Sequence, residues 1–235
     1  LIFISGERTA FFYFILSSFF MLFLTDVFKK VRLIISIVVV FCIFLMLFVS
    51  PDIKQRMLLL TMTELGISSK LLETPLEKKK SSDILVEKPA IERSIKLNKV
   101  VFFSSHHTEH YISALRMFRD NIFFGVGVKN FRKKCKETKY RITDSSCSTH
   151  PHNSYIQIMS EAGLIGLTYL TSLFFIFLFY IFKHLRSRKK NFLSDFEICM
   201  FSAILITLWP LAPTGNIFNN WLNIIFHIPL GLFLW

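Results

Sequence analysis

The chain has 235 residues, of which 52% are hydrophobic and 16% aromatic, and its mean hydropathy is +0.49. These values argue against a soluble domain, because most of the 28 phenylalanines fall in uncharged runs long enough to cross about 30 Å of hydrocarbon. The net charge of +12 does not indicate nucleic-acid binding, because the Lys and Arg residues are divided between short loops beside apolar runs and one long polar segment. The composition therefore predicts an all-α, multi-pass membrane protein.

The first fifty residues carry two apolar runs. We predict transmembrane helices at about 10–25 and 33–50, joined by the basic loop 26–32. Pro51 ends the second helix, and the polar segment 51–153 follows, which we interpret as one large, mainly helical loop domain. Within this segment, residues 66 to 100 show no sustained helical or strand period, so an irregular insertion is expected there.

The last part of the chain, 154–235, carries three more apolar runs. They predict transmembrane helices at about 160–182, 196–212 and 217–235, with the basic loop 183–195 after the first. The chain starts at a leucine and stops inside an apolar run, so we expect it to be a piece of a longer protein.

Orientation follows from the short loops, because Lys and Arg are enriched in short cytoplasmic loops. Loops 26–32 and 183–195 are strongly basic, whereas the connection PTGN at 213–216 carries no charge. We therefore expect a bacterial inner-membrane protein whose domain 51–153 faces the periplasm. Cys135 and Cys147 would share that oxidising side, and the sequence leaves open whether they form a disulfide or remain two thiols.

The stretch THPHNSYIQIMSEAGLIGL at 149–167 carries the strongest chemical signal. Pro151 favours an extended His150, and Asn153 is a good N-cap for the helix that follows. His152 would therefore lie just before a helix N-terminus, whose partial positive charge disfavours the imidazolium and favours a nearby phosphate. This interpretation gives a neutral base that can accept a proton, and the alternative is a capping-region histidine without chemistry.

A polar stripe continues along the same helix. Asn153, Gln157 and Glu161 recur every four residues, and polar groups in a span are costly unless they face protein or a watery cavity. We interpret all three as candidate substrate-binding residues. Gly163 and Gly166 form a G-x-x-G step, which is more typical of close helix packing than of a ligand site.

These residues resemble the O-antigen ligase family, whose signature is His followed by Asn, nine residues and G-x-x-G. His152, Asn153, Gly163 and Gly166 match it, and the segments SGERTA, ALRMFRDN and GVGVKNF are also similar to that family. The resemblance implies a metal-independent, inverting glycosyltransferase without cofactors. It would move a glycan from undecaprenyl diphosphate to a lipid-A-core or related acceptor at the periplasmic membrane face. A repeat-unit polymerase shares the donor chemistry and is the alternative.

The resemblance also implies residue roles. His152 would activate the acceptor hydroxyl while arginines hold the departing diphosphate. Arg8 is the first candidate, because a cation at the edge of a span is costly without an anionic partner, and the alternative is an interfacial arginine that reaches the headgroups. Arg116 is the second catalytic candidate, with Arg119 as a substrate-binding residue three positions further. The family often places its loop arginine further upstream, where this chain has histidines at 106 and 107.

Two alternatives belong to other functional classes. His106, Glu109 and His110 reproduce the H-x-x-E-H pattern of some zinc peptidases. So short a match arises easily by chance in a histidine-rich stretch, and no distant carboxylate ligand completes the site, so we predict no metal. A non-catalytic transporter, whose polar stripes line a translocation path, is the other alternative.

Overall fold

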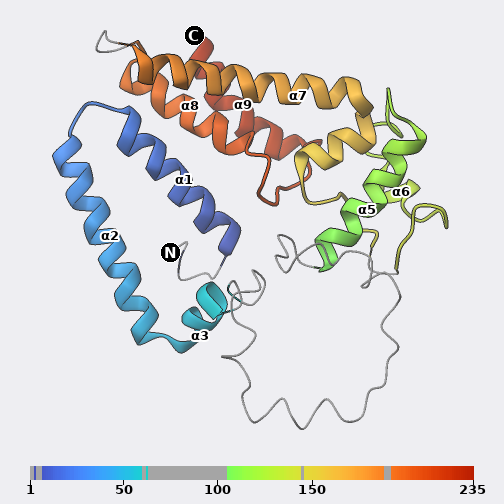
Figure 1. The fold of residues 1–235 in the computed structure, drawn as a ribbon, viewed down its shortest axis with the longest axis horizontal. Coiled ribbons are helices and arrows are strands. Elements are labelled where there is room, and N and C mark those ends of the chain that lie inside the picture. Colours follow the sequence, from blue (N-terminus) through green and yellow to red (C-terminus); the bar gives the residue numbers. More distant parts are fainter. Residues whose placement is uncertain (1–2, 4–6, 60–61, 63–104, 144–145, 188–191) are drawn as a thin grey trace.

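The computed structural model describes residues 3, 7–59, 62, 105–143, 146–187 and 192–235, and this part of the chain is all-α, as predicted (Figure 1). The expected irregular insertion at 66–100 lies outside the described residues. A π-helical turn, Gln55–Leu59, follows the third helix. The α-helices are α1 (Arg8–Leu24), α2 (Lys29–Val49), α3 (Pro51–Lys54), α5 (Ser105–Asp120), α6 (Phe131–Lys134), α7 (Ser154–Arg186), α8 (Asp195–Thr207) and α9 (Asn220–Leu234).

Two of the described helices, α2 and α7, are long and apolar enough to cross a membrane by length and composition. The apolar helices α1 and α9 are shorter, and the 13 residues of α8 give it a length of roughly 20 Å. None of the residues of α2 is buried. Most of its large apolar side chains are exposed, and such a surface requires a nonpolar environment, which for α2 lies outside the described core.

The apolar core lies among α1, α7, α8 and α9. In Figure 1, α7, α8 and α9 run side by side, and α1 runs at an angle to them. Phe201 of α8 is at the centre of this core, with its ring centroid 5.0 Å from that of Phe177 and 4.5 Å from that of Phe233. Both pairs meet edge to face, the arrangement that aromatic quadrupoles favour. The other buried members of this core are Leu24, Ile181, Leu193, Ile198, Ile204 and Leu205.

The described parts of the two basic loops lie at one end of these helices (Figure 1). The Asp195 carboxylate accepts hydrogen bonds from the backbone N–H groups of Asp26 and Val27, both at 3.1 Å. His184 Nε2 donates to the carbonyl of Leu24 at 3.1 Å. Loops 160 residues apart in the sequence are therefore joined, and the opposite end of the helices contains the residues of the 149–157 stretch.

A break at Gly163 divides α7 into two helical halves with different directions (Figure 1). Gly163 has φ 68° and ψ −158°, a conformation that is essentially restricted to glycine. The segment between α5 and α6 crosses α7 at this break. A Cβ atom on Gly163 would lie 2.4 Å from a backbone atom of Phe123, and one on Gly125 would lie 2.4 Å from the carbonyl carbon of Glu161. Gly163 therefore allows a close backbone approach, but its partner is the segment after α5 rather than another helix.

Backbone hydrogen bonds join the two segments at this crossing. Val126 N–H donates to the carbonyl of Ser160 at 2.9 Å, and Leu164 N–H donates to the carbonyl of Ile122 at 2.7 Å. These bonds satisfy groups that the break removes from the helical ladder. The crossing therefore fixes the loop domain to the apolar half of α7.

Candidate functional site

The turn into α7 places His152 in an unusual backbone conformation. Asn153 is the N-cap, as predicted, and its Oδ1 accepts hydrogen bonds from the backbone N–H groups of Tyr155 and Ile156 at 3.0 and 3.1 Å. His152, one residue earlier, has φ 58° and lies in the left-handed region. Outside glycine such conformations cost of order 1–3 kcal/mol and persist where the surroundings enforce them.

The connection between α8 and α9 supplies that enforcement. Thr214 N–H donates to the carbonyl of His152 at 2.9 Å, and the hydroxyls of Thr214 and Ser154 lie 2.8 Å apart. Asn153 Nδ2 donates to the carbonyl of Pro210 at 2.8 Å. The backbone on both sides of the histidine is therefore held by a segment about sixty residues further along the chain.

Three other imidazole rings surround the ring of His152. The ring centroids of His107, His110 and His150 lie 5.5, 5.5 and 4.2 Å from its own. His150 is fixed at both nitrogens, because Nε2 donates to the carbonyl of Thr214 at 3.3 Å and Nδ1 accepts from the hydroxyl of Thr149 at 2.9 Å. Within the described residues, no hydrogen bond engages either ring nitrogen of His152.

The environment of this ring keeps it neutral at pH 7. Burial, followed by the neighbouring His150, His107 and His110, lowers the pKa of His152 from 6.5 to about 4. Burial also lowers the pKa of His150. The sequence also predicts a neutral His152, but from the partial charge of the helix N-terminus. In the structure, burial and the neighbouring imidazole rings lower the pKa of His152 instead.

The disulfide that the sequence left open is present, joining Cys135 and Cys147. Ser146, next to it, is fully buried, and its carbonyl accepts a 2.7 Å hydrogen bond from Nδ1 of His110. A carbonyl oxygen only accepts, so Nδ1 carries the hydrogen and Nε2 of the neutral ring is an acceptor. The disulfide loop thereby sets the orientation of one of the rings beside His152.

The polar stripe of α7 is used inside the protein. Gln157 Nε2 donates to Asn216 Oδ1 at 2.8 Å and to Glu161 Oε2 at 3.1 Å, and its Oε1 accepts from Ile217 N–H at 3.2 Å. Glu161 Oε1 accepts a 2.7 Å hydrogen bond from the N–H of Phe131, at the start of α6. Gln157 is 0% exposed and Glu161 1% exposed. The structure thus places both predicted substrate-binding side chains in contacts that join α7 to its neighbours.

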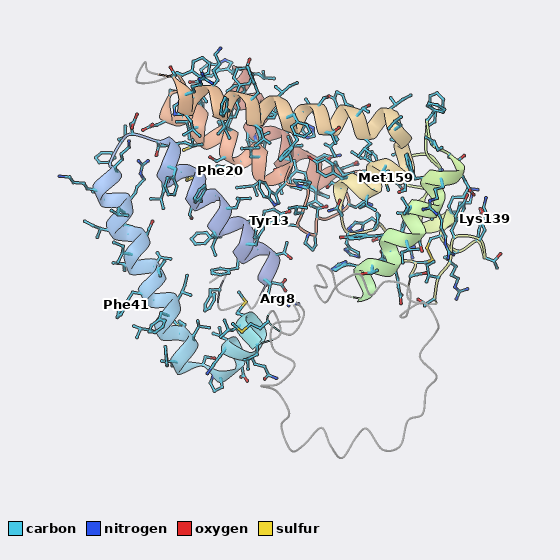
Figure 2. The ribbon with its side chains drawn as sticks, viewed as in Figure 1. Arg8, Tyr13, Phe20, Phe41, Lys139 and Met159 are labelled. Atoms are coloured by element: carbon cyan, nitrogen blue, oxygen red, sulfur yellow. A yellow bond between two sulfur atoms is a disulfide. The ribbon has the colours of Figure 1, made fainter. Side chains whose placement is uncertain are left out.

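Arg8 is exposed at the first residue of α1, at the end of the helix away from the α1–α2 loop (Figure 2). One and a half turns later, the hydroxyl of Tyr13 donates to the carbonyl of Pro213 at 3.5 Å. Pro213 adjoins Thr214, whose N–H holds the carbonyl of His152. The start of α1 and the histidine site therefore belong to the same end of the molecule.

The two loop arginines lie elsewhere on α5. Arg116 Nη1 donates to the carbonyls of Lys139 and Arg141, both at 3.4 Å, and Arg119 is exposed. At 100° per residue, Arg116 is about 180° around the helix from His107, which faces His152. Arg116 is therefore on the face of α5 that is turned away from His107 and contacts the disulfide loop instead.

Sequence reasoning missed that α5 presents histidines to this site. His107 and His110 are three residues apart and so share one face of the helix, a spacing that was readable from the sequence. What the spacing alone did not show is that this face packs against the start of α7.

The zinc-peptidase alternative gains no support from the described residues. Glu109 Oε2 accepts a 2.6 Å hydrogen bond from the Thr143 hydroxyl, and His110 is bound to the Ser146 carbonyl. The side chain of His106 lies outside the described part. Among the residues that are described, no group of three or more His, Cys, Asp or Glu side chains is arranged to hold a metal ion.

Comparison with known proteins agrees with this geometry at the level of the family. No curated protein and no solved structure matches the chain significantly. A family model described as O-antigen ligase matches residues 1–171, well over half of the chain, and the match includes Arg8, α5 and His152. The chain therefore belongs to the O-antigen ligase family, the ligase- or polymerase-type membrane enzymes that transfer glycans in lipopolysaccharide biosynthesis.

Proposed function

We propose that this protein transfers a glycan from an undecaprenyl-diphosphate carrier to a hydroxyl of lipid A-core, or a related acceptor, at the periplasmic membrane face. The proposal rests on the backbone conformation and the surroundings of His152. Its backbone is held in a left-handed conformation by Thr214, and its ring is half-buried among three other histidines. Strained residues of this kind concentrate at functional sites.

In the proposed reaction, the acceptor oxygen attacks the anomeric carbon while its proton passes to His152. The bond between that carbon and the diphosphate oxygen breaks on the opposite face, so the configuration inverts and the lipid diphosphate leaves with the electron pair. No metal takes part in this scheme. The negative charge of the bound diphosphate raises the pKa of His152, so the ring becomes a stronger base once the donor is in place.

Arg8 is the arginine that neutralises the departing diphosphate in this proposal. It lies at the end of the helices that carries His152, whereas Arg116 braces the disulfide loop through two backbone carbonyls. Asn153, Gln157 and Glu161 act by holding the site together, because their polar atoms already bind backbone and side-chain groups around it.

For the membrane arrangement we propose five spans, formed by α1, α2, α7, α8 and α9, with both basic loops in the cytoplasm. Two observations support it. The two basic loops are joined at one end through Asp195 and His184. The Cys135–Cys147 disulfide lies in the other extramembrane region, which suits an oxidising compartment such as the periplasm.

The direct test replaces His152 with glycine, which keeps the left-handed backbone without strain and removes only the ring. In cells that carry the full-length protein, His152→Gly should lower glycan transfer by about 10²- to 10⁴-fold at unchanged protein level, the usual contribution of a general base. His227→Gln, on the exposed face of α9, is the matched control and should transfer normally. Near-normal transfer by His152→Gly would refute the proposal.

The same cells distinguish a ligase from a polymerase. Loss of a ligase leaves long glycans on the lipid carrier and none on lipid A-core. Loss of a polymerase leaves single repeat units on the lipid carrier and on lipid A-core. Gel analysis of the lipopolysaccharide and of the extracted carrier lipid therefore decides between the two members of the family.

A further inference from the structure

An exposed apolar patch lies on the loop domain, where the chain leaves α5. Ile122, Phe123 and Phe124 are 47%, 64% and 77% exposed, and Val128 is 54% exposed. Clustered large apolar side chains on an extramembrane surface normally mark an interaction site.

This patch is continuous with the apolar surface of α7. Leu164 and Ile165, the first residues after the break, are themselves 39% and 55% exposed. Their N–H groups donate to the carbonyls of Ile122 and Phe123 at 2.7 and 3.4 Å. The patch therefore lies at the level where the apolar half of a candidate membrane span begins.

Cations border the patch on its C-terminal side. Lys129, Arg132 and Lys133 are exposed, and in the described part of the chain no carboxylate pairs with them. The neighbouring acids are already occupied, since Asp120 binds Lys139 at 3.1 Å and Glu137 binds Lys134 at 2.8 Å. Aromatic side chains beside unpaired cations match the boundary between acyl chains and anionic headgroups.

We propose that residues 122–128 are an interfacial anchor, in which Phe123, Phe124 and Val128 insert into the bilayer boundary while the adjacent cations bind anionic phospholipid phosphates. The inference does not depend on the transferase chemistry. The anchor also affects the position of the histidine site. The nine residues of α7 between His152 and the break span roughly 14 Å. The anchor thus fixes the break in α7, and with it the segment that carries His152 at its other end, relative to the apolar layer.

The test is the depth of a fluorophore in the intact protein. Cys42 and Cys199 are replaced by serine, the disulfide is kept, and an environment-sensitive label is attached at Phe124→Cys. The matched control is the same label at Thr138→Cys, an exposed position inside the disulfide loop. Both proteins are reconstituted in vesicles of phosphatidylethanolamine and phosphatidylglycerol that contain lipids with a nitroxide close to the headgroup.

We expect severalfold stronger quenching of the label at position 124 than at position 138. Replacing phosphatidylglycerol with phosphatidylcholine should weaken the quenching at 124. Equal quenching at the two positions overturns the anchor, and quenching at 124 that is indifferent to phosphatidylglycerol overturns its anionic-lipid contact. A Phe123→Cys variant provides an independent second position. No glycan is involved, so failure here leaves the proposed function standing.

Discussion

The two halves of α7, separated by Gly163, use polar residues in opposite ways. In the first half Gln157, Ser160 and Glu161 are buried, and each forms hydrogen bonds inside the protein. In the second half most side chains are apolar and many are exposed, as a span requires. The comparison shows that a polar stripe entering a span is here internal structure, while the proposed chemistry lies two residues before the helix begins.

The largest effect is expected at the joint between the halves. Gly163→Ala forces a side chain into a glycine-only conformation and against the backbone of Phe123, so it should destabilise the fold by at least about 3 kcal/mol. Gly231→Ala is the control, because nothing lies within 4 Å of the added methyl group. Fluorescence-detected size-exclusion after graded heating measures both. A Gly163→Ala protein as heat-resistant as the control would mean that the two halves are not locked together.

A smaller effect is expected within the first half. Glu161→Ala removes the acceptor of the Phe131 N–H and of the Gln157 amide, and each buried donor left unpaired costs about 1–3 kcal/mol. Thr168→Ala, on the exposed surface of the second half, should cost little. Glycan transfer per folded molecule should stay near normal in both the Glu161→Ala and the Thr168→Ala variants. Unchanged stability combined with lost transfer in Glu161→Ala would instead support direct substrate binding by this carboxylate.

The smallest effect concerns pH. The pKa of His152 is about 4 in the folded protein and 6.5 in an exposed histidine, so the unfolded chain binds the extra proton between these values. His152 therefore lowers stability as the pH falls from 6.5 towards 4 and has no effect above that window. The acid limb of kcat/KM, which reports the free enzyme, should lie well below pH 6.5.

His110→Gln sharpens this prediction. It removes one of the neighbouring rings that lower the pKa of His152, while burial, the main cause, stays. The acid limb should therefore move up by a fraction of a pH unit. Measuring kcat/KM against pH for both proteins in detergent checks it, and an acid limb at pH 6.5 in the unaltered protein would contradict the buried-ring picture.

The parts of the site that were readable from the sequence are those that depend on neighbouring residues. Asn153 was identified as an N-cap because capping involves backbone groups two and three residues away. The left-handed conformation of His152 depends on Thr214, and the partner of Glu161 is Phe131, thirty residues earlier. Such contacts follow from how distant helices cross, which local periodicity does not encode.

The loop arginine illustrates the same limit. Arg116 and Arg119 were selected by residue type and family resemblance, and both are on α5 as expected. The rotation of α5 about its own axis decides which face meets α7, and it brings His107 and His110 to the site instead. A helical wheel for α5 shows which residues share each face, but not which face packs against α7.

The backbone of His152 also limits how this site can be lost during evolution. Besides glycine, the left-handed region is tolerated mainly by Asn, Asp and His, and it is strongly unfavourable for β-branched residues. A relative that has abandoned the reaction but kept the protein should therefore carry Gly, Asn or Asp at this position. Val or Ile there would strain the turn as well as remove the ring, so these residues should be rare in such relatives.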